Sequence, residues 1–458
     1  MKKNKKNIKS RLIILLCIIV IFPVGWMLVV KLESEVPSIS LDLSSPFIGK
    51  KQSIPIEVSD SKSGLREVWI GLVQAGKEVV IFKKEYPGEV IIGGGKEKLA
   101  SFKIEVEPKL IGMKDGKAML RMVARDFSWR KWWHGNRTYV EKDVTIDTTS
   151  PQIDILSKAH NISQGGSGLV IYKLSEPCPT SGVYVGEKFF PGHTGKFKDV
   201  NIVMAFFALG YKQKPVTEIY VKAIDFSGNS SRAGFRHYIK KQNFKKVSLD
   251  ISDKFLNWKM PEFDDDIQYD SQISNNDKFV KINNDLRLAN HGKIVEVVKK
   301  TAKELYWNGA FMRLPRSARK AGFAEHRKYK HKGRIIDRQV HLGIDLASVA
   351  HSPIPAANKG KVAFSGDLGI YGKTVIMDHG FGLFSSYSHL SAIDVEKGQI
   401  ISKSEIIGRT GSTGLAGGDH LHFGMLVHDT FVNPVEWWDM TWIKNNILTK
   451  IDSVRSIE

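Results

Sequence analysis

Cysteine is scarce in this sequence, with two in 458 residues, Cys17 and Cys178. Two cysteines exclude a disulfide-rich scaffold and any site of four thiolates, whether for zinc or for an iron–sulfur cluster. A metal ion bound by this chain would therefore need histidine and carboxylate ligands. A hydrophobic content of 42% excludes a disordered chain, and the length predicts about three domains.

Acidic residues are few relative to basic ones. The 48 Asp and Glu residues are outnumbered by 68 Lys and Arg residues, which gives a formal net charge of +20. Such an excess predicts an acidic partner, and the candidates are nucleic acid, a membrane surface and an anionic polymer. Charge alone does not choose among them.

One long uncharged apolar run, Leu12 to Val30, follows a basic tail of residues 1–11 that has no acidic residue. Nineteen helical residues reach about 28 Å, close to the hydrocarbon thickness of a bilayer. The positive flank predicts a cytoplasmic N-terminus and export of everything after Lys31, which disfavours nucleic acid as a partner. No small-x-small cleavage signature occurs around Pro23 to Trp26, so an uncleaved anchor over 12–30 is predicted, with a cleaved signal peptide as the alternative.

Helical periodicity is nearly absent from Val36 to Lys245, where short apolar runs are broken by Gly, Pro, Ser and Asn. This pattern is typical of β-sandwiches. A weak repeat, Ala124 to Ser128 against Ala223 to Ser227, has an offset of 99 residues, the size of one sandwich. The pattern resembles tandem bacterial immunoglobulin-like modules and predicts one over 36–147 and a second over 148–245. Trp129, Trp132 and Trp133 fit either sugar stacking or packing on their own sheet.

Residues 246–312 are predicted to form a linker and a helical connector. An acidic stretch from Asp264 to Asp277 is expected to be solvated. His291 to Trp307 places Ile294, Val298 and Leu305 on one face, which predicts an amphipathic helix packed against the next domain.

The stretch His341 to Leu346 alternates polar and apolar residues, so His341, Gly343 and Asp345 share one strand face. Four residues of straight strand span about 13 Å, which is too far for two side chains to ligate one ion at about 2 Å. If His341 and Asp345 are co-ligands, the chain must bend between them. Gly343 is the residue that would permit the bend.

A glycine-rich loop over 411–418 runs into His420 and His422. The two histidines lie at i and i+2, so both imidazoles face the same side of a strand and can open into one cavity. An H-x-H pair alone has a high false-positive rate.

The combination is more specific, because His341 with Asp345, then His389 before Leu390, then the glycine loop with His420 and His422 occur in this order within 82 residues. Over Phe323 to Trp438 the chain resembles the lysostaphin/LytM-type zinc endopeptidases of bacterial cell walls. The resemblance implies that His341, Asp345 and His422 bind one Zn²⁺, and that His389 and His420 serve catalysis. Three protein ligands leave an open fourth position, as in catalytic zinc sites. Which of His389 and His420 is the general base stays open.

The expected fold is mainly β: an anchor, two sandwiches, the connector, an antiparallel-sheet LytM-type peptidase domain over 313–442 and a C-terminal tail over 443–458. The implied function is that of a membrane-anchored zinc metalloendopeptidase that hydrolyses peptide crosslinks of peptidoglycan through a zinc-activated water, for cell-wall remodelling. The expected location is the inner (cytoplasmic) membrane, single-pass, with the catalytic domain in the periplasm or at the cell exterior. The alternative is a non-catalytic LytM-like envelope protein that binds peptidoglycan or regulates another wall hydrolase.

Two further expectations concern the residues before the first proposed ligand. Tyr329 is a candidate hydroxyl donor to the oxyanion. The basic segment Arg313 to Arg338 holds ten Lys or Arg residues against Glu325 and Asp337, and it is predicted to flank the cleft and to attract anionic wall polymer.

Overall fold

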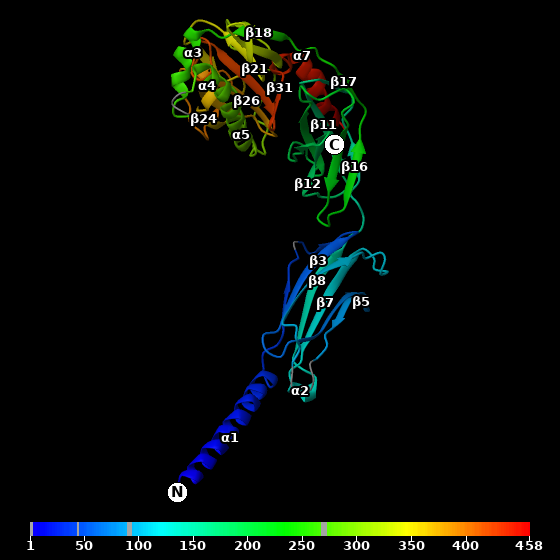
Figure 1. Cartoon of the computed structure of the whole chain (residues 1–458). Helices are drawn as coiled ribbons and strands as arrows, with labels where there is room; N and C mark the ends of the chain where they lie inside the picture. The colour runs from blue at the N-terminus through cyan, green and yellow to red at the C-terminus, as the bar shows by residue number, and fades with distance from the viewer. Residues whose placement is uncertain (1–2, 44, 89–93, 267–272) are drawn as a thin grey trace. The chain divides into compact units, whose positions relative to one another are not determined.

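The computed structural model of the chain describes residues 3–43, 45–88, 94–266 and 273–458 (Figure 1). Strands account for 42% of the chain and helices for 19%, which confirms the mainly β fold. The chain forms two compact units, an N-terminal unit of residues 1–150 and 224–230, and a C-terminal unit of residues 151–223 and 231–458. Each unit is described by itself.

The N-terminal unit begins with helix α1 (Lys3–Lys31). Its segment Ser10–Lys31 has a mean hydropathy of 3.1, and none of its most apolar stretch of 18 residues is buried. By length and composition this helix can cross a membrane, although a signal sequence would pass the same test. The first two residues of the predicted basic tail lie outside the described residues.

The rest of the N-terminal unit is a sandwich of a three-stranded and a five-stranded sheet. Ile54, Ile56 and Val58 on β3 alternate with more exposed residues, because one face of that strand packs on the core and the other faces solvent. The first sheet has the order β1 (Ser38–Leu41), β3 (Gln52–Ser59), β6 (Leu99–Val106). The second has the order β2 (Phe47–Ile48), β8 (Arg137–Ile146), β7 (Gly116–Asp126), β4 (Leu65–Gln74), β5 (Lys77–Glu85).

The internal sequence repeat corresponds to a repeated turn. Asp126 accepts hydrogen bonds from the backbone N–H groups of Ser128 and Asn136, and Asp225 accepts them in the same way from Ser227 and Asn229. The repeated aspartates therefore hold the chain in turns, which is a structural role.

The C-terminal unit contains a second sandwich, with β14 buried along its whole length. One sheet has the order β14 (Ile202–Ala208), β11 (Ser167–Leu174), β9 (Ile153–Ile155). The other has the order β13 (Lys188–Pro191), β12 (Thr180–Val185), β15 (Ile219–Ile224), β16 (Ser230–Gly234), and a parallel pair joins β10 (His160–Ser163) to β17 (His237–Lys240).

The connector is mostly helical, and its last helix differs from the prediction over 291–307. Helix α5 begins at Arg287 and ends at Val298, because Asp378 binds the Thr301 hydroxyl and the Ala302 N–H and holds the following chain extended. The connector elements are β18 (Lys246–Asp250), α3 (Asp253–Lys259), η1 (Met260–Phe263), α4 (Asn275–Lys281), the π-helix η2 (Ile282–Leu286) and α5 (Arg287–Val298). Asp270 of the acidic stretch lies outside the described residues.

The largest sheet of the C-terminal unit runs in the order β19, β22, β30, β26, β25, β24, β28, with β31 paired to β30. Its strands are β19 (Ala318–Ala321), β22 (Ile344–Ala347), β24 (Gly360–Asp367), β25 (Lys373–Asp378), β26 (Leu383–Leu390), β28 (Ile400–Ile401), β30 (Leu421–Val427) and β31 (Thr430–Val432). Two smaller sheets flank it, one of β18, β20 (Glu325–His331) and β21 (Arg334–His341), the other of β23 (Pro353–Pro355), β29 (Ile406–Arg409) and β27 (Ala392–Ile393). A short helix, η3 (Gly369–Tyr371), precedes β25.

The sequence predicts a C-terminal tail over residues 443–458. In the structure this segment is largely helical. The C-terminal helices are α6 (Pro434–Trp438), α7 (Met440–Ile443), η4 (Lys444–Leu448) and α8 (Thr449–Arg455). Ile443, Ile447, Ile451 and Val454 are buried at helical spacing, and Lys450 donates a hydrogen bond to the Leu169 carbonyl of β11. This segment therefore packs on the second sandwich.

Candidate metal centre

The chain bends between His341 and Asp345, as co-ligation would require. Strand β21 ends at His341 and β22 begins at Ile344, and the His341 Nε2 atom lies 2.9 Å from the Asp345 Oδ1 atom. Gly343 lies in this bend, but its φ is not in the left-handed region. A Cβ atom at Gly343 would stand 2.5 Å from the His422 ring, so glycine is needed here for space.

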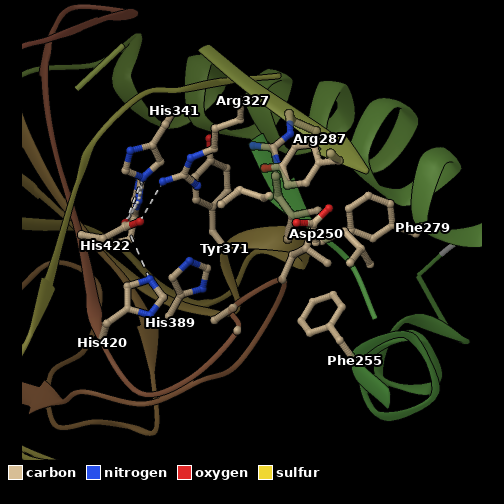
Figure 2. A pocket seen from close by; sticks show the side chains of 18 residues that line it. Asp250, Phe255, Phe279, Arg287, Arg327, His341, Tyr371, His389, His420 and His422 are labelled. Carbon is tan, nitrogen blue, oxygen red and sulfur yellow. Dashed lines mark hydrogen bonds and ion pairs between the residues drawn. The ribbon is translucent and has the colours of Figure 1, made fainter. Parts of the chain in front are cut away.

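The third predicted ligand comes from the neighbouring strand. In the antiparallel pairing of β22 with β30, Asp345 lies opposite His422. The His422 Nδ1 atom is 2.9 Å from Asp345 Oδ1 and 2.9 Å from His341 Nε2. The structure therefore brings all three predicted ligands into one group (Figure 2).

The two predicted catalytic histidines open into the same cavity as this group. The ring of His389, at the end of β26, lies 4.9 Å from the ring of His420 and 5.8 Å from that of His422. The His420 Nε2 atom is 3.6 Å from Asp345 Oδ1. His389 has a φ of +66°, a left-handed conformation that is strained for a residue other than glycine and is found often at functional sites.

Three of these imidazoles are oriented in the same way. In each, Nδ1 lies 2.8 Å from a backbone carbonyl oxygen, as in His341 to Gly322, His389 to Thr413 and His420 to Gly418. A neutral ring that donates from Nδ1 keeps its lone pair on Nε2. In all three residues the Nδ1 contact leaves Nε2 for the cavity, where it carries a lone pair in a neutral ring and an N–H in a protonated one.

The donor set fits a zinc ion. Two imidazole nitrogens and one carboxylate oxygen lie 2.9 Å from one another, close enough for all three to hold one zinc ion at bonds of about 2 Å. Gly322 supplies the outer hydrogen bond that orients His341. The His422 Nε2 atom is buried and has no hydrogen-bond partner among the described residues.

Burial and neighbouring charges set the protonation states of the site. Burial lowers the pKa of His422 to about 4. Burial also holds the pKa of His389 well below its usual value, and the charges of His420 and His422 add to this effect. For Asp345, burial acts to raise the pKa, but His341 and the hydrogen bonds of the histidines outweigh it, so the pKa lies well below its usual value. His422 and Asp345 are therefore in the deprotonated form that metal ions bind.

Two neighbours of the site had no specific signal in the sequence. Arg327 on β20 donates from Nη2 to Asp345 Oδ2 at 3.0 Å. The Oδ1 atom of Asp345 therefore faces the histidines, and its Oδ2 atom faces Arg327. Tyr371 of η3 has its ring 5.9 Å from that of His422. Tyr329 lines the cavity, with its ring 5.4 Å from Phe279, and its oxyanion role stays a prediction.

The donor set and the two further histidines are of the kind found in metallohydrolases. Residues 339–434 match the family model described as Peptidase family M23, which confirms the resemblance seen in the sequence. The chain therefore contains an M23 peptidase domain of the LytM type.

Two curated relatives each match about a fifth of the chain. The DD-carboxypeptidase/endopeptidase Mpg of Neisseria meningitidis serogroup B is 38% identical over 97 residues, which cover 21% of this chain and 22% of that protein. The peptidoglycan DD-endopeptidase ShyA of Vibrio cholerae serotype O1 is 34% identical over 96 residues, 21% of this chain and 22% of that protein. The matched segment thus spans about a fifth of the length of these relatives.

A solved structure, the catalytic domain of lysostaphin from Staphylococcus simulans, is 25% identical and covers 27% of this chain and 92% of that one, with a TM-score of 0.23.

Proposed function

We propose that the protein is a membrane-anchored zinc metalloendopeptidase that hydrolyses peptide crosslinks of peptidoglycan. The observation that carries this proposal is the triangle of His341 Nε2, Asp345 Oδ1 and His422 Nδ1, with His389 and His420 beside it in one cavity. The match to Peptidase family M23 and the names of the curated relatives support the reaction class and the substrate.

His341, Asp345 and His422 would hold one Zn²⁺ per chain. When bound, zinc supplies Lewis acidity, which polarises the scissile carbonyl and lowers the pKa of water toward about 7. Arg327 keeps the Asp345 carboxylate oriented by binding its second oxygen.

The two remaining histidines would move the protons. With Nδ1 bound to the Thr413 carbonyl and a depressed pKa, His389 stays neutral and presents Nε2 to accept a proton from the attacking water. Burial acts to lower the pKa of His420, but its hydrogen bond and charge interaction with Asp345 raise it overall. A protonated His420 can donate to the developing oxyanion or to the leaving amine. The pKa directions thus favour His389 as the general base.

Helix α1 would anchor the protein in the inner membrane as a single span, with the M23 domain in the periplasm or at the cell exterior. The two sandwiches would act as scaffold or spacer between membrane and wall. In this proposal the two sandwiches span 36–147 and 148–245, the linker and helical connector span 246–312, and the peptidase domain spans 313–442.

The test is hydrolysis of a soluble crosslinked muropeptide dimer by full-length protein in detergent, with zinc measured per chain. We expect one zinc per chain and release of monomers, with zinc binding lost in His341→Ala and turnover lost in His420→Ala while zinc is retained. Zinc-loaded protein that binds the dimer without cleaving it would instead favour the non-catalytic envelope protein.

A further inference from the structure

One face of the connector helices is fixed against the M23 domain next to the metal centre. Asn290 on α5 is fully buried, and its Oδ1 atom accepts a hydrogen bond from the Ile370 N–H of η3 at 2.8 Å. A Cβ atom at Gly369 would stand 2.5 Å from the same Oδ1 atom, so helix and loop are in close contact. This contact places Arg287, one helical turn before Asn290, at the wall of the cavity.

The guanidinium of Arg287 is held in place by Asn283. Arg287 Nε donates to the Asn283 carbonyl oxygen at 3.1 Å and to Asn283 Oδ1 at 3.2 Å, and Nη2 also donates to Oδ1. Asn283 is fully buried and donates in turn to Asp337 of β21. Among the described residues no partner binds Nη1, so the outer edge of the guanidinium keeps free N–H donors.

Arg287 lines the same cavity as the predicted metal ligands. Figure 2 shows its guanidinium across the cavity from the histidines, near Phe279 and Asp250. Tyr371, whose ring lies 5.9 Å from that of His422, lines the cavity together with Arg287. A group bound to Arg287 would therefore lie in the cavity that the proposed zinc ligands line.

Among the described residues no carboxylate forms an ion pair with Arg287. Arg327 is paired with Asp345, and Asp250 lines the same cavity but forms no ion pair with Arg287 within 4.0 Å in the described part of the chain. The wall around Arg287 is otherwise apolar, with Leu249, Phe255 and Phe279. A guanidinium fork in such a setting matches a carboxylate, which it can bind through two parallel hydrogen bonds.

We propose that Arg287 is a specificity-determining residue that binds a free carboxylate of the peptide substrate next to the scissile bond. This inference rests on the proposed peptidase function. It narrows the substrate class to crosslinked stem peptides with an ionised carboxylate beside the bond that is cut, and it predicts discrimination against peptides in which that carboxylate is amidated.

The test compares a crosslinked muropeptide dimer with dimers carboxamidated at each free carboxylate in turn. Hydrolysis is measured with full-length wild type, Arg287→Gln and Arg287→Lys, and Kd is measured for each in a His420→Ala background, where turnover does not interfere. Lys293→Gln removes a cation from the exposed face of the same helix and is the matched control.

For wild type and Lys293→Gln we expect carboxamidation at one of the free carboxylates of the dimer to raise the KM and Kd for that dimer about 10- to 100-fold. Arg287→Gln should bind the free and amidated dimers equally weakly, with zinc content and kcat largely retained, and Arg287→Lys should restore part of the preference. Equal Kd values for all dimers in wild type, or a wild-type preference in Arg287→Gln, would overturn the inference. Failure of wild type to hydrolyse any dimer would contradict the proposed function, while the Kd values would still decide the role of Arg287.

A separate observation concerns the loop between β7 and β8 in the N-terminal unit, which contains the short helix α2 (Arg130–Trp133). The loop is tied to the end of α1, because Trp129 N–H donates to the Lys31 carbonyl at 2.7 Å and Arg130 Nε donates to the Leu32 carbonyl at 3.0 Å. Trp132 is 91% exposed and Trp133 is 57% exposed, next to Lys131. Figure 1 shows α2 beside the end of α1.

From this contact we infer that the tip of the loop, Arg130–Trp133, inserts into the headgroup region of the membrane that α1 would cross. Tryptophan and basic side chains are enriched at this depth, where the indole ring has one apolar and one polar side. Sugar stacking, the other use considered for these tryptophans, would require the rings to remain in water.

The test places an environment-sensitive fluorophore on Trp132→Cys in a Cys17→Ser, Cys178→Ser chain, reconstituted in phosphatidylethanolamine/phosphatidylglycerol vesicles. We expect blue-shifted emission and quenching by nitroxides attached at the lipid headgroup, whereas the same label on Lys214→Cys, at an exposed site of the second sandwich, should show neither. Emission typical of water, without lipid quenching, would overturn the inference.

Discussion

Gly343 illustrates how closely the strands of the metal centre approach each other. A Cβ atom there would stand 2.5 Å from the His422 ring and 2.9 Å from the Phe423 carbonyl oxygen, and neither can move freely in a buried sheet. We expect Gly343→Ala to displace His422 and to weaken zinc binding about 10- to 100-fold, a loss of the size caused by disturbing the groups that orient a metal ligand.

Zinc per chain after dialysis against a competing chelator measures this effect. Gly234→Ala is the matched control, because a Cβ atom added there would meet no other atom within 4 Å and its φ is ordinary. Full zinc retention in Gly343→Ala would show that the bend tolerates a side chain. It would also show that the close approach of residue 343 to the His422 ring is not needed for zinc binding.

The depressed pKa of His389 determines the pH dependence of the proposed reaction. A general base works only when neutral, so the acid limb of kcat/KM reports its pKa in the free enzyme. Burial lowers this pKa, and a bound divalent cation would lower it further. We therefore expect the acid limb below pH 6.5 and a flat rate from there to pH 7.5, measured on a soluble dimer. An acid limb above pH 6.5 would exclude His389, as described, from the role of base.

At the scale of single elements, the strand period predicted much of the site. Alternation on β22 and the i, i+2 spacing of His420 and His422 are local properties, so they could be inferred from the sequence. The need for a bend between His341 and Asp345 followed from strand geometry alone.

Other parts of the site depend on tertiary structure. The pairing of β25 with β26 is irregular between Lys373 and Val375, and His389 lies beside this irregularity with a positive φ. Arg287 reaches the cavity because α5 packs on η3, far away in sequence. The helical spacing of Ile443, Ile447 and Ile451 is a local signal, and in the structure these residues are buried on one side of the C-terminal helices.

Helix α6 carries a buried carboxylate that should make stability depend on pH. Burial raises the pKa of Glu436 to about 7, although the Ser167 N–H and hydroxyl donate to it. Unfolded glutamate titrates near 4.3, so between these values the folded state holds a proton that the unfolded state releases. The stabilisation from this group is therefore greatest at low pH and falls, by at most about 4 kcal/mol, as the pH rises toward 7.

We expect Glu436→Gln to flatten the pH dependence of the unfolding temperature of the C-terminal unit between pH 5 and pH 8, and to raise that temperature at pH 8. Glu396→Gln, at an exposed carboxylate, serves as the control and should keep the wild-type slope. An unchanged slope in Glu436→Gln would mean that Glu436 does not titrate in this range.

At the scale of the whole molecule, the net charge of +20 is concentrated in part on β20 and β21, beside the cavity. Arg327 from this segment lines the cavity itself. We expect replacement of Lys328, Lys330, Arg334 and Arg338 by Gln to weaken binding to purified sacculi at low salt, because these charges would attract anionic wall polymer, and the difference should shrink at high salt. Pelleting of labelled protein with sacculi measures it. Equal binding of wild type and this variant at low salt would show that these basic residues are ordinary solvent-exposed residues that do not contribute to binding.

The most direct test of the proposed peptidase function is digestion of purified sacculi by full-length, zinc-loaded protein, followed by mass analysis of the released fragments. We predict that crosslinked dimers give way to monomers that each gain one water at a peptide bond, and that zinc-loaded His420→Ala releases none. Sacculi that stay fully crosslinked, across several crosslink chemistries and with stoichiometric zinc in the protein, would contradict the proposed function.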